Sequence, residues 1–126
     1  MAAVAAGGVL GAEARYGLAA ALPHTARTWP WATLVTNTLG CLLIGVLMVV
    51  LLDVAAAPPK LARPFLGVGV LGGFTTFSTF ALDTYSLIRT HRELAALSYL
   101  AASLVACLVA VTVAVAGSRR LLVRPR

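Results

Sequence analysis

Four long apolar stretches occupy nearly the whole chain and limit what it can fold into. They cover residues 2–22, 31–52, 64–88 and 94–117 of a 126-residue sequence that is 60% hydrophobic and only 11% charged. A membrane-spanning helix needs about 20 mostly apolar residues, whereas a soluble domain of this length could not bury so much apolar surface. We therefore predict an all-α membrane protein with four transmembrane helices, forming one integral membrane domain over residues 1–126.

Basic residues in the connections indicate how these spans are oriented. The side that carries both termini would hold Lys60, Arg63, Arg119, Arg120, Arg124 and Arg126. The opposite side would hold Arg27, Arg89 and Arg92. Because cytoplasmic loops are enriched in Lys and Arg, this distribution predicts a cytoplasmic N-terminus and C-terminus. The bases follow membrane topology, so we expect the lipid bilayer and no nucleic acid as a partner.

The third apolar stretch contains the least lipid-compatible segment, GGFTTFSTF at residues 72–80. In a bilayer, polar side chains and irregular backbone are tolerated only where they face protein or a water-lined cavity. The two glycines invite a break in this helix, and the freed carbonyls could hold a small hard cation such as sodium. The hydroxyls and the positive edges of the Phe rings suit an anion that must bind and still leave. The alternative is a packed aromatic core whose hydroxyls bond to carbonyls one turn earlier.

Two other stretches each carry a polar stripe at helical spacing. The stripes comprise Thr33, Asn37 and Cys41 in the second stretch and Tyr99, Ser103 and Cys107 in the fourth. Residues four apart lie on one face of a helix. Asn37 at mid-membrane depth either bonds to a neighbouring helix or faces a pore or ligand, and both alternatives stay open.

The first stretch combines small residues with two charges. Gly7 and Gly11 have the spacing that lets helix backbones approach closely. Glu13 and Arg15 are two residues apart, so they point about 200° from one another on a helix and need not pair. We expect Arg15 either near a vestibule, where it attracts an anion, or bonded to carbonyls of a broken helix.

The cysteines and histidines do not have the spacing of a metal site. Cys41 and Cys107 fall inside predicted spans, where buried thiols behave as small apolar groups. His24 and His91 are single histidines in predicted loops. No Cys/His spacing typical of a zinc site occurs in the sequence, and we expect neither histidine to act as a ligand.

Three motifs together resemble the Fluc (CrcB) family of fluoride ion channels. The segment at 72–80 resembles the signature of the third helix, GGVLGAEARY at 7–16 resembles the first-helix motif, and TLVTNTLG at 33–40 resembles the second-helix motif. The resemblance covers the whole chain in order and in length. It implies an antiparallel dimer with two fluoride pores along the subunit interface and a structural sodium ion at the dimer centre.

The resemblance also implies roles for individual residues. Sodium would be held by the backbone carbonyls of Gly72 and Thr75. The pore and its polar track would be lined by Asn37, Phe77, Ser78, Thr79, Phe80, Tyr99 and Ser103. Arg15 and Asp83 would be structural or lie near the vestibule, although glutamate is more usual in the family where this chain has Asp83. The partner subunit would be a second copy of this chain or a paralogous subunit in a heterodimer.

The sequence therefore predicts a passive, fluoride-selective channel of the plasma (inner) membrane that lowers fluoride toxicity, and not an enzyme. Two other functions stay open. A proton-coupled drug exporter of the small multidrug-resistance type has four helices and an essential glutamate in the first helix, and Glu13 stands at a comparable place. A scaffold subunit would use the same polar residues only to hold helices together. A cation exporter, however, has no reason to carry the phenylalanine and hydroxyl run of the third stretch.

Overall fold

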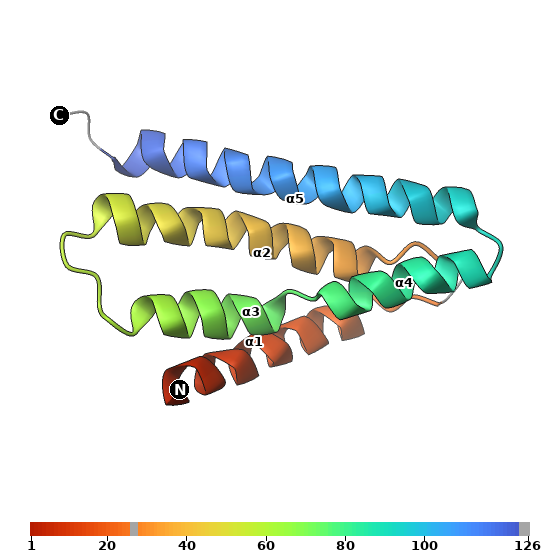
Figure 1. Ribbon diagram of the computed structural model, residues 1–126, viewed down its shortest axis with the longest axis horizontal. Coiled ribbons are helices and arrows are strands. Elements are labelled where there is room, and N and C mark those ends of the chain that lie inside the picture. Colours follow the sequence, from red (N-terminus) through yellow and green to blue (C-terminus); the bar gives the residue numbers. More distant parts are fainter. Residues whose placement is uncertain (26–27, 124–126) are drawn as a thin grey trace.

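The computed structural model describes residues 1–25 and 28–123, and every regular element in that part of the chain is helical (Figure 1). The elements are α1 (Ala2–Ala21), α2 (Trp31–Val49), η1 (Val50–Val54), η2 (Arg63–Leu71), α3 (Gly72–Phe74), α4 (Phe77–Arg89) and α5 (Glu93–Leu122). Here η1 and η2 are π-helical segments that continue directly from α2 and into α3. The prediction of an all-α chain is confirmed for the described residues.

Three helical segments of the described chain are long and apolar enough to cross a membrane. They are Trp31–Val54, Arg63–Arg89 and Glu93–Leu122. Helix α1 has 20 residues but is not among them, because Glu13 and Arg15 lower its apolar character. Length and composition thus support three of the four predicted spans, and α5 extends beyond the predicted end at residue 117.

Helices α2 and α5 lie side by side and run in the same direction (Figure 1). At their C-terminal ends, Arg119 Nε donates a hydrogen bond of 2.8 Å to the carboxylate of Asp53, 66 residues earlier. The same separation relates Gly45 to Val111, whose carbonyl oxygen would lie 3.0 Å from a Cβ added at the glycine. The two helices therefore keep one constant register along their contact.

Helix α1 packs against η2 and α3 through glycines. A Cβ added at Gly7 would overlap the carbonyl oxygen of Phe65, and one added at Gly11 would overlap that of Val70. Both glycines are buried. The close backbone approach predicted from their spacing is confirmed, and it holds α1 against the third helical stretch.

The third stretch is helical through its glycine pair and changes conformation two residues later. Gly72 has φ −65° and ψ −35°, which is helical. Thr75 (φ −75°, ψ 158°) and Thr76 (φ −149°, ψ 121°) are extended. The glycines invited a break in this helix, and the interruption lies directly after them, at Thr75 and Thr76. Gly73 also permits contact with α1, since a Cβ there would lie 2.5 Å from the carbonyl oxygen of Gly8.

The buried core is small and lies at the end where α4 meets α5. Leu87, Ala96 and Tyr99 form it, and Trp29 and Phe80 pack against it. Many large apolar side chains elsewhere are exposed on the single chain. Extensive exposed apolar surface marks contact with lipid or with another protein, which agrees with the apolar spans.

The two ends of the molecule carry the basic residues as the sequence predicted. The start of α1, the end of α5 and the connection from η1 to η2 lie at one end, and the connection from α4 to α5 lies at the other (Figure 1). The first end therefore holds Lys60, Arg63, Arg119 and Arg120. Arg27, Arg124 and Arg126 lie outside the described residues.

Candidate functional site

The side chain of Asn37 on α2 bonds to both backbone groups of Thr76. Its Nδ2 donates to the Thr76 carbonyl oxygen (3.0 Å), and its Oδ1 accepts from the Thr76 N–H (2.9 Å). In an uninterrupted helix that N–H would donate to the carbonyl of Gly72, four residues earlier. The Asn37 amide therefore replaces the helical acceptor of the Thr76 N–H.

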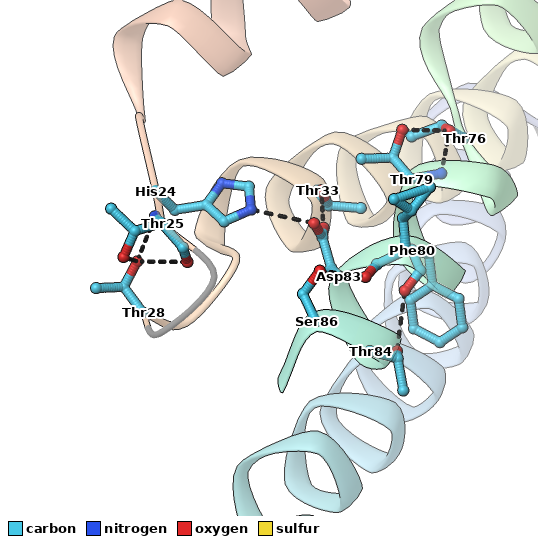
Figure 2. Close-up of polar contacts among 11 residues, drawn as sticks. His24, Thr25, Thr28, Thr33, Thr76, Thr79, Phe80, Asp83, Thr84 and Ser86 are labelled. Atoms are coloured by element: carbon cyan, nitrogen blue, oxygen red, sulfur yellow. Dashed lines mark hydrogen bonds and ion pairs between the residues drawn. The ribbon is translucent and has the colours of Figure 1, made fainter. Parts of the chain in front are cut away.

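The hydroxyl of Thr76 caps the start of α4. The N–H of Thr79 donates to Thr76 Oγ1 (3.1 Å), and that hydroxyl donates to Thr79 Oγ1 (2.9 Å; Figure 2). The Thr79 N–H would otherwise reach the carbonyl of Thr75. The carbonyls of Gly72 and Thr75 thus both lose the donor that a continuous helix would supply. These are the two oxygens expected to hold sodium.

A groove of about 380 Å³, here called the phenylalanine groove, lies between α2, α4 and α5. Its lining residues are Asn37, Cys41, Thr75, Thr76, Phe77, Phe80, Ser103, Leu104 and Cys107. Four of the seven predicted pore residues therefore come together: Asn37, Phe77, Phe80 and Ser103. The groove is mostly apolar, its lining includes hydroxyl and amide groups, and none of its lining side chains carries a full charge.

The phenylalanine rings lead from the surface into the core. Phe77 is 81% exposed, and its ring centroid lies 5.9 Å from that of Phe80. Phe80 in turn lies 5.3 Å from the ring of Tyr99. Tyr99 is fully buried and is not among the residues that line the groove. Its hydroxyl and that of Ser103 have no hydrogen-bond partner within the described part of the chain.

A second groove of about 320 Å³, here called the Arg15 groove, lies between α1, α2 and α4. It is lined by Ala12, Arg15, Tyr16, Ala19, His24, Ala32, Thr33, Thr36, Thr76 and Thr79. Arg15 and Thr79 were both predicted site residues. Glu13 does not line it, as the angle between positions 13 and 15 predicts. Thr76 lines both grooves, whereas Ser78 is exposed and lines neither.

Asp83 ties the loop after α1 to α2 and α4. Thr33 Oγ1 donates to Asp83 Oδ2 (2.6 Å), and His24 Nε2 donates to Asp83 Oδ1 (3.1 Å; Figure 2). The carboxylate side chain is only 11% exposed. A carboxylate with two donors at this burial is satisfied. Of the two roles expected for Asp83, structural or near the vestibule, these contacts support the structural one. They also give His24 a specific partner.

Sequence reasoning did not assign Thr76 or His24 to the site, and it placed Thr33 on a polar stripe without identifying Asp83 as its partner. The role of Thr76 could have been predicted, because threonine is a preferred N-cap residue at the start of a helix. His24 lies 59 residues from Asp83, and Thr33 lies 50 residues from it. Local sequence patterns do not predict contacts over such separations.

The sequence matches the family model described as "CrcB-like protein, Camphor Resistance (CrcB)" over residues 2–115. It is 51% identical to "Fluoride-specific ion channel FluC 2" of Thermobifida fusca, covering 98% of this chain and 91% of that protein. It is 49% identical to "Fluoride-specific ion channel FluC 1" of Streptomyces coelicolor, covering 97% and 79% respectively. It is 40% identical to "Fluoride-specific ion channel FluC" of Hahella chejuensis, with 94% of each chain covered.

Proposed function

The chain belongs to the CrcB-like protein family, and from this membership we propose that it is a fluoride-selective ion channel. One observation carries the proposal: relatives that are about half identical over nearly the whole chain are described as fluoride-specific ion channels. The helices that are apolar enough to span a bilayer support an integral, multi-pass membrane protein. We assign it to the plasma membrane.

The physical task of such a channel is to release a trapped anion. Hydrogen fluoride crosses lipid as a neutral molecule and dissociates at the higher pH of the cytoplasm. The anion then cannot return through lipid, because a bare charge in hydrocarbon is costly. A passive pore lets the membrane potential drive fluoride outward, since moving one charge through 100 mV corresponds to about 2.3 kcal/mol.

The phenylalanine groove supplies groups suited to fluoride. The ring edges of Phe77 and Phe80 carry partial positive charge, and the Ser103 hydroxyl can donate to an anion. Because these groups are neutral, they can replace part of the lost hydration without holding the ion too tightly. The Arg15 groove adds a full positive charge at a separate opening, which would attract the anion toward the pore.

The exposed face of the groove supports assembly with a second copy. Phe77 is 81% exposed, and no atom lies within 4 Å of a Cβ added at Gly72. A large exposed aromatic and an open backbone position five residues earlier in the chain both suit burial against another subunit. We propose an antiparallel homodimer, with two pores along its interface; a heterodimer with a paralogous subunit is the alternative outcome.

The residues present fit a structural sodium ion at the centre of that dimer. The carbonyls of Gly72 and Thr75 have lost their helical donors to Asn37 and Thr76. Carbonyl oxygens are hard ligands of the kind that hard cations prefer. A bound sodium would supply positive charge where the two interrupted helices face each other. Asn37 and Thr76 prepare that site by holding the backbone extended.

The test is fluoride efflux from liposomes that contain only this purified chain, recorded with a fluoride electrode. We expect rapid fluoride efflux and no comparable chloride efflux from matched vesicles. Correctly folded protein without fluoride efflux would contradict the homodimeric channel. Co-expression with a paralogous subunit would then test the heterodimer.

The drug-exporter alternative is tested at Glu13. Glu13 does not line the Arg15 groove or the phenylalanine groove. Glu13→Gln should leave fluoride efflux close to the wild-type rate, because no anion contact depends on that carboxylate. In an exporter that exchanges protons for a cation at Glu13, the same substitution would abolish transport.

A further inference from the structure

Cys41 and Cys107 lie opposite one another on the two parallel helices. They are separated by the same 66 residues that join Asp53 to Arg119 along α2 and α5. Both residues line the phenylalanine groove, and Cys107 is the neighbouring group that interacts with the Cys41 thiol. This position is one turn from the contact of Gly45 with Val111, so packing of the helices holds the two sulfurs together.

Both thiols are available to a small ion. Each cysteine is free and half-buried, and both line the phenylalanine groove. They are the only cysteines in the chain. The proposed channel function uses neither of them, so the pair is unexplained by fluoride conduction.

The donor set points to one class of ligand. Thiolates are soft ligands that select soft metal ions such as Cu(I). Within the described residues no group of three or more His, Cys, Asp or Glu side chains could hold a metal ion, so a four-ligand zinc site is not provided. Two opposed sulfurs instead suit the two-coordinate geometry of monovalent soft ions.

We propose that Cys41 and Cys107 form an intramolecular binding site for a soft monovalent metal ion, Cu(I) or Ag(I), beside the phenylalanine groove. Binding is not a redox step. Each thiol releases one proton to solvent, each resulting thiolate donates an electron pair to the ion, and the metal keeps its oxidation state. The two thiolates and one cation leave a net charge of about −1 in the groove, from simple charge counting.

The first experiment measures binding without reference to fluoride. Purified chain in detergent is titrated with silver nitrate in chloride-free buffer, with thiolate-to-silver absorption and bound silver per chain as readouts. We expect one Ag(I) per chain. Cys41→Ala and Cys107→Ala should each weaken binding by about 100-fold or more, because the second thiol acts at high effective concentration.

A relocated thiol provides the matched control. Combining Cys107→Ala with Leu108→Cys keeps two thiols in the chain but turns one of them about 100° around α5. This variant should bind silver as weakly as the single alanine variants. Equal affinity for the wild type, the single variants and the relocated variant would overturn the shared site.

A second experiment tests whether silver bound at this site changes fluoride efflux. Only this experiment rests on the proposed channel function. Silver should slow fluoride efflux in wild-type liposomes, since a negative complex in the groove repels an anion. It should have little effect on Cys41→Ala. If the chain gives no efflux at all, the channel proposal fails while the silver titration still decides the thiol site.

Discussion

The side-chain amide of Asn37 pairs with both the N–H and the carbonyl of Thr76, at 2.9 and 3.0 Å. This contact lets two residues leave the helix without leaving the Thr76 N–H unpaired. An unpaired backbone group in hydrocarbon costs several kcal/mol. Asn37 lies 39 residues before Thr76. A side chain of α2 therefore stabilises the extended conformation in the third helical stretch. Asn37 therefore has a structural role in addition to lining the phenylalanine groove.

We predict that Asn37→Ala destabilises the chain and lowers fluoride efflux. The substitution leaves the partly buried Thr76 N–H without its acceptor, at a cost of about 1–3 kcal/mol. Thr38→Val is the matched control, because the buried Thr38 hydroxyl has no hydrogen-bond partner among the described residues; its loss should be neutral or slightly stabilising. Denaturant unfolding in detergent micelles measures both. Equal stability of the two variants would contradict the bracing role.

Thr76 should tolerate serine but not valine. Its hydroxyl accepts from the N–H of Thr79, and loss of such an N-cap costs about 1 kcal/mol. Thr76→Val has nearly the same shape and removes that acceptor, whereas Thr76→Ser keeps it. We expect the valine variant alone to lose stability and efflux. A serine variant as impaired as the valine variant would show that the methyl group, not the hydroxyl, is what matters.

Local patterns predicted the helices because apolar stretches of this length leave few alternatives. The stripes of Asn37 and Ser103 were also visible, since residues four apart share a helix face. Their convergence on one groove with Phe77 and Phe80 is a tertiary result. It follows from the parallel register of α2 and α5, which no single stretch encodes.

The position of the helix interruption could not be read from glycine content alone. Gly72 and Gly73 are permissive residues, but a permissive residue stays helical unless another group replaces its hydrogen bonds. Asn37 and the Thr76 hydroxyl provide those replacements two residues further on. Similarly, the role of Asp83 depends on His24 and Thr33, which come from distant segments.

Gly11 and Gly17 on α1 should respond in opposite ways to alanine. A Cβ at Gly11 would overlap the Val70 carbonyl oxygen and lie 2.7 Å from the backbone nitrogen of Phe74, whereas a Cβ at Gly17 meets nothing within 4 Å. Gly11→Ala should therefore cost about 1–3 kcal/mol by forcing α1 away. Gly17→Ala should be neutral, or stabilising by up to about 1 kcal/mol, because it improves helix propensity. Thermal unfolding of both variants in one detergent tests the pair, and destabilisation by Gly17→Ala alone would refute the described packing.

A substitution at Phe77 distinguishes an effect on conduction from an effect on folding. Its side chain is 81% exposed on the single chain, so Phe77→Ile should leave the folded subunit intact. Loss of the aromatic ring removes an edge interaction of about 1 kcal/mol, which corresponds to roughly fivefold in an equilibrium or rate. We expect fluoride efflux to fall by at least that factor.

Leu82→Ile is the control on the same helix, since Leu82 is 64% exposed and lines neither groove. Fluoride efflux through this variant should stay unchanged. Full efflux from Phe77→Ile would contradict a pore-lining role for the ring, and a loss of dimers on size-exclusion chromatography would assign the ring to assembly instead.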